Sequence, residues 1–333
     1  MSEKKEQIPC EKFKTTIGGQ ALIEGIMMRG PEKDAVVVCT AEGLNIDVKS
    51  RKLRPKKSPW NWPFLRGVAN MADSLKVGQK SLMDSAKLVE TQEEESTSKF
   101  DQWLERKLSN KKTEKIAMGI IYVFAFAMMI GMFFLIPMIV ASFFDNWIHD
   151  LVLLNLLEGF VRILIIIGYM WLCSLIKDMR RVFSYHGAEH KVIRCYEAGL
   201  PLTVENVRIQ KRMHPRCGTS FLIVIAIVSV LVFSVASSGL LAIFPWLKGM
   251  AGTFSYRLLM IVFKLLTLPL VVAIGYEINR IVARHDNWFT RILMAPGIYL
   301  QYITTKEPDD RMIEVGIAAL EAVLPEVEGS DKW

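Results

Sequence analysis

Cysteine and histidine are scarce in this chain of 333 residues, which holds five of each. The N-terminus, MSEKKEQIPC, lacks an apolar run, so we expect no cleaved secretory peptide. The glycine-rich stretch GGQALIEGIMMRGP lacks the GxGxxG and GxxxxGK[ST] spacings, so it does not predict a nucleotide-binding loop. No separate basic domain is evident either, and we expect no nucleic-acid partner.

Charged residues are missing from two long segments, 116–144 and 219–247, which are 29 residues each. About 20 apolar residues suffice to cross the hydrocarbon core of a bilayer, so both segments predict transmembrane helices. Two weaker candidates are 151–176, which carries two charges, and 258–282, which carries three. The sequence therefore predicts a predominantly α integral membrane protein with four transmembrane helices.

Basic residues are unevenly distributed around these spans. Four lysines lie between residues 107 and 115, nine Lys or Arg lie in 177–218, and three arginines lie between 280 and 291, whereas the loop DNWIHD has none. Cytoplasmic loops are enriched in Lys and Arg. We therefore expect a multi-pass protein of the inner (plasma) membrane, in contact with membrane lipids, with both termini cytoplasmic. The cysteines then lie on or near the reducing side, where disulfides are rare.

The regions outside the spans predict a small cytoplasmic α+β part. AVVVC (35–39) and LNIDV (44–48) flank the turn TAEG, which predicts a β-hairpin. The stretch that starts at WNWPFLRG predicts an amphipathic helix, and so does EPDDRMIEVGIAALEAVL near the C-terminus.

These elements suggest three consecutive parts. Residues 1–105 would form the cytoplasmic hairpin and amphipathic helix. Residues 106–283 would form the four-helix transmembrane domain, with the cytoplasmic loop 177–218 inside it. Residues 284–333 would form an interfacial helix and the C-terminal amphipathic helix.

Three of the five histidines lie in the 177–218 loop. In FSYHGAEHKV, His186 and His190 are four residues apart with Glu189 between them, and HPRCGTSF adds His214 and Cys217. Side chains at i and i+4 share a helix face, and imidazole and thiolate are suitable ligands for Zn²⁺. The segment therefore predicts a divalent metal site, most simply for zinc, at the inner membrane surface.

The role of such a site depends on the number of ligands. His186, His190, His214 and Cys217 together would close a tetrahedral shell and make the metal structural. Three ligands would leave one position for water, with Glu189 as the general base. The alternative without a metal is a set of hydrogen-bonded helix residues and a small buried cysteine.

Several blocks together, YHGAEHK, HPRCGTSF, GGQALIEGIMMRGP, PFLRG and ITTKEPDD, resemble the bacterial YqhQ family of membrane proteins over nearly the whole chain. That family is described as a predicted metal-dependent enzyme without an established substrate. The resemblance implies a site at the five residues named above. It also implies that further residues of these blocks belong to the second shell or bind substrate: Glu24, Arg29, Glu307, Asp309 and Asp310.

Four ionisable residues lie inside the predicted spans. Glu158 and Arg162 are four residues apart in the second span, and Lys264 and Glu277 lie in the fourth. Such residues face a partner or a cavity more often than lipid, although snorkelling near a span end is the alternative. Glu277, near the inner end, could also reach the histidine site as an extra ligand or a second-shell carboxylate.

These observations favour a membrane metal-binding protein, specifically a metal-dependent hydrolase acting at the cytoplasmic membrane face. A lipid-linked or membrane-protein substrate would suit that position. Two alternatives remain open: a transporter or channel with a polar path through the spans and a structural metal, or a scaffold or regulatory protein. Homo-oligomerisation is compatible with the charged helix faces.

Overall fold

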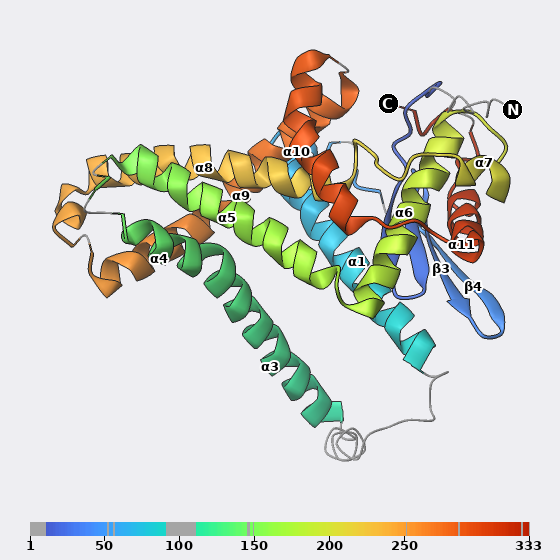
Figure 1. Ribbon diagram of the computed structural model, residues 1–333, viewed down its shortest axis with the longest axis horizontal. Coiled ribbons are helices and arrows are strands. Elements are labelled where there is room, and N and C mark those ends of the chain that lie inside the picture. Colours follow the sequence, from blue (N-terminus) through green and yellow to red (C-terminus); the bar gives the residue numbers. More distant parts are fainter. Residues whose placement is uncertain are drawn as a thin grey trace, which may run out of the picture. The chain divides into compact units, whose positions relative to one another are not determined.

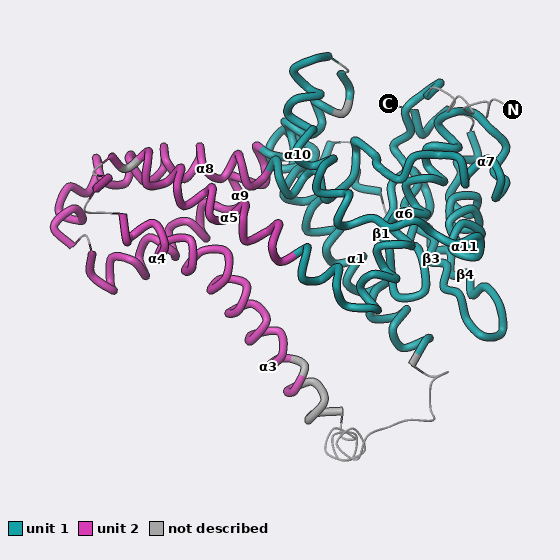
Figure 2. Tube along the Cα trace, in the orientation of Figure 1, with its two compact units in different colours: residues 1–92, 170–224, 275–333 teal, residues 93–169, 225–274 magenta. Residues whose placement is uncertain are grey.

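The computed structural model describes residues 11–90, 111–144 and 147–332, apart from the single positions 52, 56, 149, 251, 286 and 328. The chain divides into two compact units, coloured separately in Figure 2. The first unit combines residues 1–92, 170–224 and 275–333, and the second combines 93–169 and 225–274. Segment 177–218 thus packs with the N- and C-terminal segments, which the three-part division kept separate. The boundary at 105/106 lies outside the described residues.

A four-stranded antiparallel sheet organises the first unit, with strand order β1-β2-β3-β4. The strands are β1 (Gly18–Leu22), β2 (Gly25–Arg29), β3 (Lys33–Thr40) and β4 (Gly43–Ser50). The predicted hairpin is confirmed as β3–β4, with Thr40 opposite Gly43 at the turn. The glycine-rich stretch, in which no strand was predicted, forms the preceding hairpin β1–β2.

Helices cover both faces of this sheet. Ile26 and Met28 pack in one core with residues of α6 (Lys177–Glu197) and α11 (Asp310–Glu321). Met27, between them, accepts a hydrogen bond from Ser81 of α1 (Leu65–Glu90). Because strand side chains alternate between faces, α1 lies on the face opposite α6 and α11. Figure 1 shows α6 and α11 beside the blue strands.

The two predicted amphipathic helices are confirmed as α1 and α11. The first unit also contains η1 (Pro59–Asn61), α7 (Val204–Arg208) and α10 (Trp288–Thr304).

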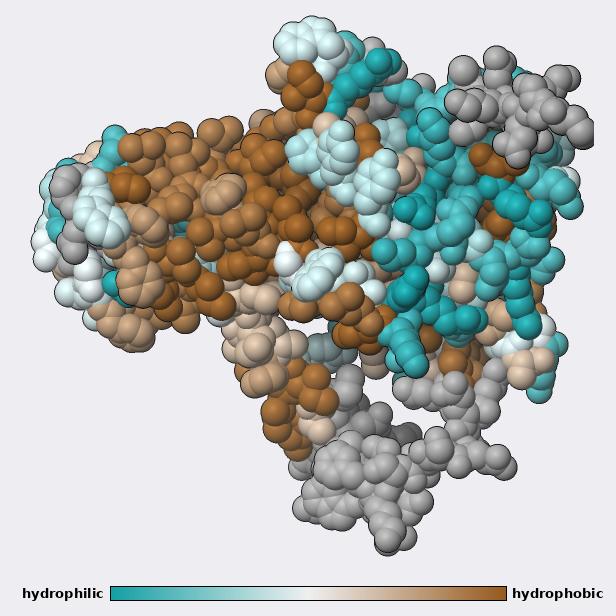
Figure 3. Space-filling model, viewed as in Figure 1, coloured by the Kyte–Doolittle hydropathy of each residue, from teal (hydrophilic) through white to brown (hydrophobic). Residues whose placement is uncertain are grey.

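Four helical stretches are long and apolar enough to cross a membrane, as predicted: Gly119–Ser142, Val152–Cys173, Gly218–Ile243 and Phe254–Val282. The first stretch is formed by the C-terminal part of α3 (Lys111–Ile130), the π-helical turn η2 (Gly131–Leu135) and α4 (Ile136–Ser142). The other three lie in α5 (Leu151–Cys173), α8 (Gly218–Ile243) and α9 (Phe254–Arg284), and η3 (Pro245–Met250) follows α8. The surface over these helices in the second unit is largely apolar (Figure 3). An apolar surface of this extent marks a membrane or protein contact.

Candidate metal centre

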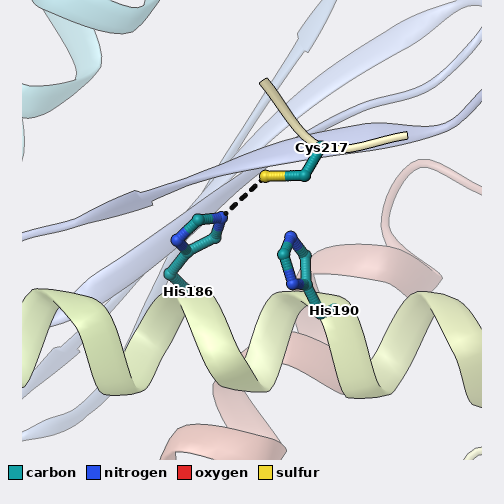
Figure 4. A group of neighbouring side chains, drawn as sticks. All are labelled: His186, His190 and Cys217. Atoms are coloured by element: carbon teal, nitrogen blue, oxygen red, sulfur yellow. Dashed lines mark hydrogen bonds between the residues drawn. The ribbon is translucent and has the colours of Figure 1, made fainter. Parts of the chain in front are cut away.

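Helix α6 carries the two histidines of the FSYHGAEHKV block. His186 and His190 point from the same side of the helix, as their spacing predicted (Figure 4). Their ring centroids are 4.4 Å apart. Gly187 lets another backbone segment pass close by, because a Cβ there would lie 2.0 Å from the carbonyl oxygen of Lys306. That segment also supplies a partner to His186.

A buried glutamine holds the HPRCGTSF block against α10. The side chain of Gln301, fully buried, accepts a hydrogen bond from the backbone N–H of His214 at 2.8 Å. Its amide group donates to the carbonyl oxygen of His214 at 2.8 Å and to the hydroxyl of Ser220 at 3.0 Å. Gly297, one turn earlier, allows this approach, since a Cβ there would lie 2.5 Å from the Cα of Ser220. Cys217 lies between these two anchor points.

Both imidazoles are oriented by backbone carbonyls. His186 Nδ1 lies 2.8 Å from the carbonyl oxygen of Thr304, and His190 Nδ1 hydrogen-bonds to the carbonyl oxygen of Arg212. A carbonyl only accepts, so Nδ1 of each ring must carry the proton. A ring that is protonated on Nδ1 alone presents its Nε2 lone pair, which is the arrangement that metal-binding histidines use.

Cys217 completes a group of three ligand atoms. One nitrogen of His186, one of His190 and Cys217 Sγ all lie within 4.8 Å of one another. His186 Nε2 is 3.1 Å from Sγ, the contact drawn in Figure 4. His190 Nε2 is buried and has no hydrogen-bond partner among the described residues. We call these three residues the His/Cys cluster.

The electrostatics of the His/Cys cluster favour metal-binding protonation states. Burial lowers the pKa of His190 to about 4, so the ring is neutral at pH 7. Burial disfavours the thiolate of Cys217 and the hydrogen bonds from Thr219 favour it; the pKa of Cys217 is lowered. Neutral imidazole and thiolate are the forms that coordinate zinc.

Glu189 is buried beside this cluster. Its Oε1 accepts a hydrogen bond from the backbone N–H of Gly19 at 3.0 Å. Burial raises the pKa of Glu189 to about 7, partly opposed by His186. Gly19 must be glycine for this contact, because a Cβ would lie 2.9 Å from Glu189 Cγ and 2.8 Å from the carbonyl oxygen of Met27. The strand β1 thus fixes the carboxyl group that the sequence predicted as a general base.

His214 is not one of the three converging ligand residues. Its Nε2 lies 3.2 Å from a carboxylate oxygen of Glu197, which is fully buried. Glu197 also pairs with Arg216 and accepts a hydrogen bond from the backbone N–H of Thr15 at 2.8 Å. Burial lowers the pKa of His214 well below its usual value, and the Arg216 charge adds to that effect. The predicted four-ligand set therefore splits into a three-residue cluster and a separate His–Glu–Arg pairing.

Two of the predicted second-shell residues contact groups on or around α6. Glu24 pairs with Arg181 and accepts a hydrogen bond from the Tyr185 hydroxyl at 3.1 Å. Glu307 pairs with the buried Lys191 and lies 3.7 Å from Arg212, whose carbonyl orients His190. Both carboxylates therefore support the helix that carries the histidines.

The other four predicted second-shell residues have partners outside the His/Cys cluster. They are Arg29 with Asp34 and Asp73, Glu277 with Arg66, Asp309 capping the N-terminus of α11, and Asp310 with Arg208. Glu277, which the sequence suggested as an extra metal ligand, accepts a hydrogen bond from Arg66 Nε at 2.7 Å. Its carboxylate is therefore already paired.

The three remaining charged residues of the candidate spans meet in the second unit. Glu158 accepts hydrogen bonds from Arg162 at 2.8 Å and from Lys264 at 2.5 Å, and all three are buried. The three residues therefore pair with one another. We call these three residues the span triad.

Sequence reasoning missed two buried polar residues at the site, Gln301 and Glu197. Gln301 lies inside an apolar stretch, and its partner His214 is 87 residues away. A single amide in a helix has no spacing that marks it. Glu197 also lacks a motif, and only its position two turns after His190 on the same helix could have drawn attention to it.

The comparisons with known proteins agree on a family without an assigned activity. A family model described as "Protein of unknown function (DUF1385)" matches residues 62–326. The chain is 31% identical over 319 residues to a Bacillus subtilis (strain 168) protein named "Uncharacterized protein YqhQ", and the match covers 94% of this chain and 93% of that protein. No solved structure matches the chain significantly.

Proposed function

The chain belongs to the DUF1385 family, and from that premise we propose that it is an integral membrane metalloprotein that holds a divalent cation, zinc by preference, at His186, His190 and Cys217. The observation that carries the proposal is the orientation of the two imidazoles. Each is fixed through Nδ1 to a backbone carbonyl, and the buried Nε2 of His190 is left without a partner. A buried polar atom without a partner is costly, and a metal ion would satisfy it.

The donor set suits zinc rather than magnesium or calcium. Two imidazole nitrogens and a sulfur are the ligands that zinc takes, whereas the harder cations prefer oxygen. Three protein ligands leave a fourth position, where bound zinc lowers the pKa of a water to about 7. This ligand count supports a catalytic rather than a structural metal.

Glu189 is the residue that would handle protons in a hydrolysis. Its pKa of about 7 means that the carboxyl group both accepts and returns a proton near neutral pH. The hydrogen bond from Gly19 holds one of its oxygens in place. We therefore propose that the reaction is a metal-dependent hydrolysis with Glu189 as general base.

The position of the ligands in the chain suggests a membrane-bound substrate. Cys217 immediately precedes the apolar stretch Gly218–Ile243, and α6 begins four residues after the stretch that ends at Cys173. If both stretches cross the bilayer, the His/Cys cluster lies at the end of two spans. Basic flanks support the cytoplasmic side, so the proposed substrate is a lipid-linked molecule or a membrane protein.

Metal content of the purified full-length protein tests the binding proposal. After removal of the affinity tag, the wild type should carry about one zinc per chain by inductively coupled plasma mass spectrometry, because three ligands of this type bind zinc tightly. The double variant His186→Ala/His190→Ala and the single variant Cys217→Ser should carry almost none. Cys195→Ala is the matched control: Cys195 is buried on α6 outside the cluster. Metal-free wild type, saturated with zinc and dialysed, would refute the proposal if it retained none.

Replacing Glu189 by glutamine separates a catalytic metal from a structural one. Glutamine keeps the size of the side chain and can still accept the hydrogen bond from Gly19, so the variant should keep its zinc. Hydrolysis of fluorogenic ester, amide and phosphoester probes by the zinc-loaded protein in nanodiscs should fall by about 100-fold or more, the usual contribution of general base catalysis. Equal rates in wild type and variant would indicate a structural metal, as a scaffold protein would have.

A further inference from the structure

The span triad in the second unit has more positive than negative charge. Glu158 is the single carboxylate, and Arg162 and Lys264 both donate to it. The other partners of Arg162 are uncharged: the carbonyl oxygen of Phe133 at 2.9 Å and the hydroxyl of Ser229 at 3.0 Å. Phe133 lies in the π-helical turn η2.

The excess charge is not screened by water in the usual way. Glu158 and Arg162 are each 6% exposed and Lys264 is 3% exposed. Burying an ion without a counter-charge costs several kcal/mol even after relaxation. With every carboxylate oxygen of Glu158 engaged by one of the two cations, a further negative charge near Lys264 would balance the triad.

A cavity of about 110 Å³ adjoins this triad. Glu158 and Lys264 line it together with a second cation, Arg257, and the polar side chains of Asn155 and Ser237. A water needs about 10–15 Å³ of space measured in this way, so the cavity has room for a small ion with several waters.

One hydroxyl in the lining lacks a partner. Ser237 Oγ is buried, has no hydrogen-bond partner in the described part of the chain, and belongs to a residue only 2% exposed. A donor left unpaired at the wall of a positively charged cavity is what an anion would engage.

We propose that this cavity binds a small inorganic monoanion, of which chloride is the test case. Lys264 and Arg257 supply the attraction and Ser237 donates a hydrogen bond. Glu158 reduces the net charge of the three charged residues that line the cavity to +1, which one monovalent anion balances. A cation would meet two positive groups and one carboxylate already engaged, which disfavours it. This site is independent of the His/Cys cluster and of its proposed chemistry.

Chloride titration of the detergent-solubilised full-length protein tests the proposal. Chloride replaces gluconate at constant ionic strength, and tryptophan fluorescence follows thermal unfolding. Because a ligand that binds only the folded state stabilises it, the unfolding midpoint should rise with chloride along a saturating curve. Ser237→Ala should raise the half-saturating chloride concentration by at least about fivefold, as loss of a hydrogen bond to a charged group implies. Lys264→Met should abolish the dependence.

Ser234→Ala is the matched control. Ser234 is on the same helix, α8, is 8% exposed and also has an unpartnered hydroxyl among the described residues, but it does not line the cavity. It should leave the chloride curve of the wild type unchanged. An unfolding midpoint of the wild type that is the same in chloride and gluconate would overturn the proposal. An equal shift in the Ser234 and Ser237 variants would overturn it too.

Discussion

Replacing Gln301 by leucine is expected to destabilise the first unit by about 3 kcal/mol or more. Leucine fills a similar volume but makes none of the three hydrogen bonds of the amide group. The N–H and C=O of His214 and the hydroxyl of Ser220 would then be left unpaired beside a fully buried side chain. Each unsatisfied buried group costs about 1–3 kcal/mol, so the sum is large even if the neighbours relax.

The same substitution should weaken metal binding without touching a ligand. Gln301 anchors the chain on both sides of Cys217, at His214 and at Ser220, and therefore sets where the sulfur lies. Loss of such support typically costs 10- to 100-fold in metal affinity. Competition with a zinc-sensitive dye would measure the affinity, and chemical denaturation would measure the stability.

Gln301→Glu serves as the first control, because it keeps an acceptor for the N–H of His214 and should be less damaging at low pH, where the carboxyl group is protonated. Thr305→Val is the second. The hydroxyl of Thr305 is buried one turn later on the same chain segment, but it donates only to the carbonyl oxygen of Gln301. It should lose about 1 kcal/mol and keep the metal affinity. Similar metal affinities in Gln301→Leu and the wild type would show that the loop holds Cys217 without this clamp.

The elements that could be predicted from the sequence are those whose signal is local. A run of apolar residues defines a span regardless of its neighbours, and the three consecutive valines within 35–39 favour a strand. The spacing of His186 and His190 sets them on one helix face, so their convergence followed from α-helical geometry alone.

The first hairpin was missed for a reason that lies in its packing. Its glycines, Gly19 and Gly25, resemble a loop in sequence. In the fold, neighbouring atoms leave no room for a side chain at either glycine. Gly19 faces Glu189, and a Cβ on Gly25 would lie 2.5 Å from the carbonyl oxygen of Val37. Glycine in a strand often marks such close approach, but only the partner shows it.

The position of His214 outside the His/Cys cluster also depends on residues distant in the sequence. Its short spacing to Cys217 suggested one shared metal site. In the fold, Gln301 hydrogen-bonds to its backbone and Glu197 pairs with its ring, and neither partner is near it in the sequence. A spacing rule states which residues can meet, whereas long-range hydrogen bonds decide which of them do.

Replacing Glu158 by glutamine should be among the most damaging single substitutions in the second unit. It removes the only carboxylate of the span triad and leaves Arg162 and Lys264 as two buried cations without a counter-charge. Removing one partner of a buried ion pair costs about 3–5 kcal/mol, since the remaining charge stays desolvated. The free energy of unfolding in mixed micelles, from a titration with sodium dodecyl sulfate, should fall by that amount.

A second substitution should restore part of the loss if the damage is electrostatic. Glu158→Gln/Lys264→Met removes one of the two uncompensated cations, and its methionine keeps the unbranched shape of the lysine stem. The double variant should therefore unfold at a higher fraction of sodium dodecyl sulfate than Glu158→Gln alone. Such non-additivity is typical of charges in contact. Arg162 would still be held by the carbonyl of Phe133 and the hydroxyl of Ser229, and this is why recovery should be partial.

The matched control is the other span carboxylate, Glu277. It pairs with Arg66, but its side chain is 16% exposed and that of Arg66 is 25% exposed, so water can replace the lost partner. Glu277→Gln should therefore cost no more than about 1 kcal/mol. If both glutamine variants lost the same stability, burial of the triad would not be what makes Glu158 necessary, because burial is the property in which the two pairs differ most.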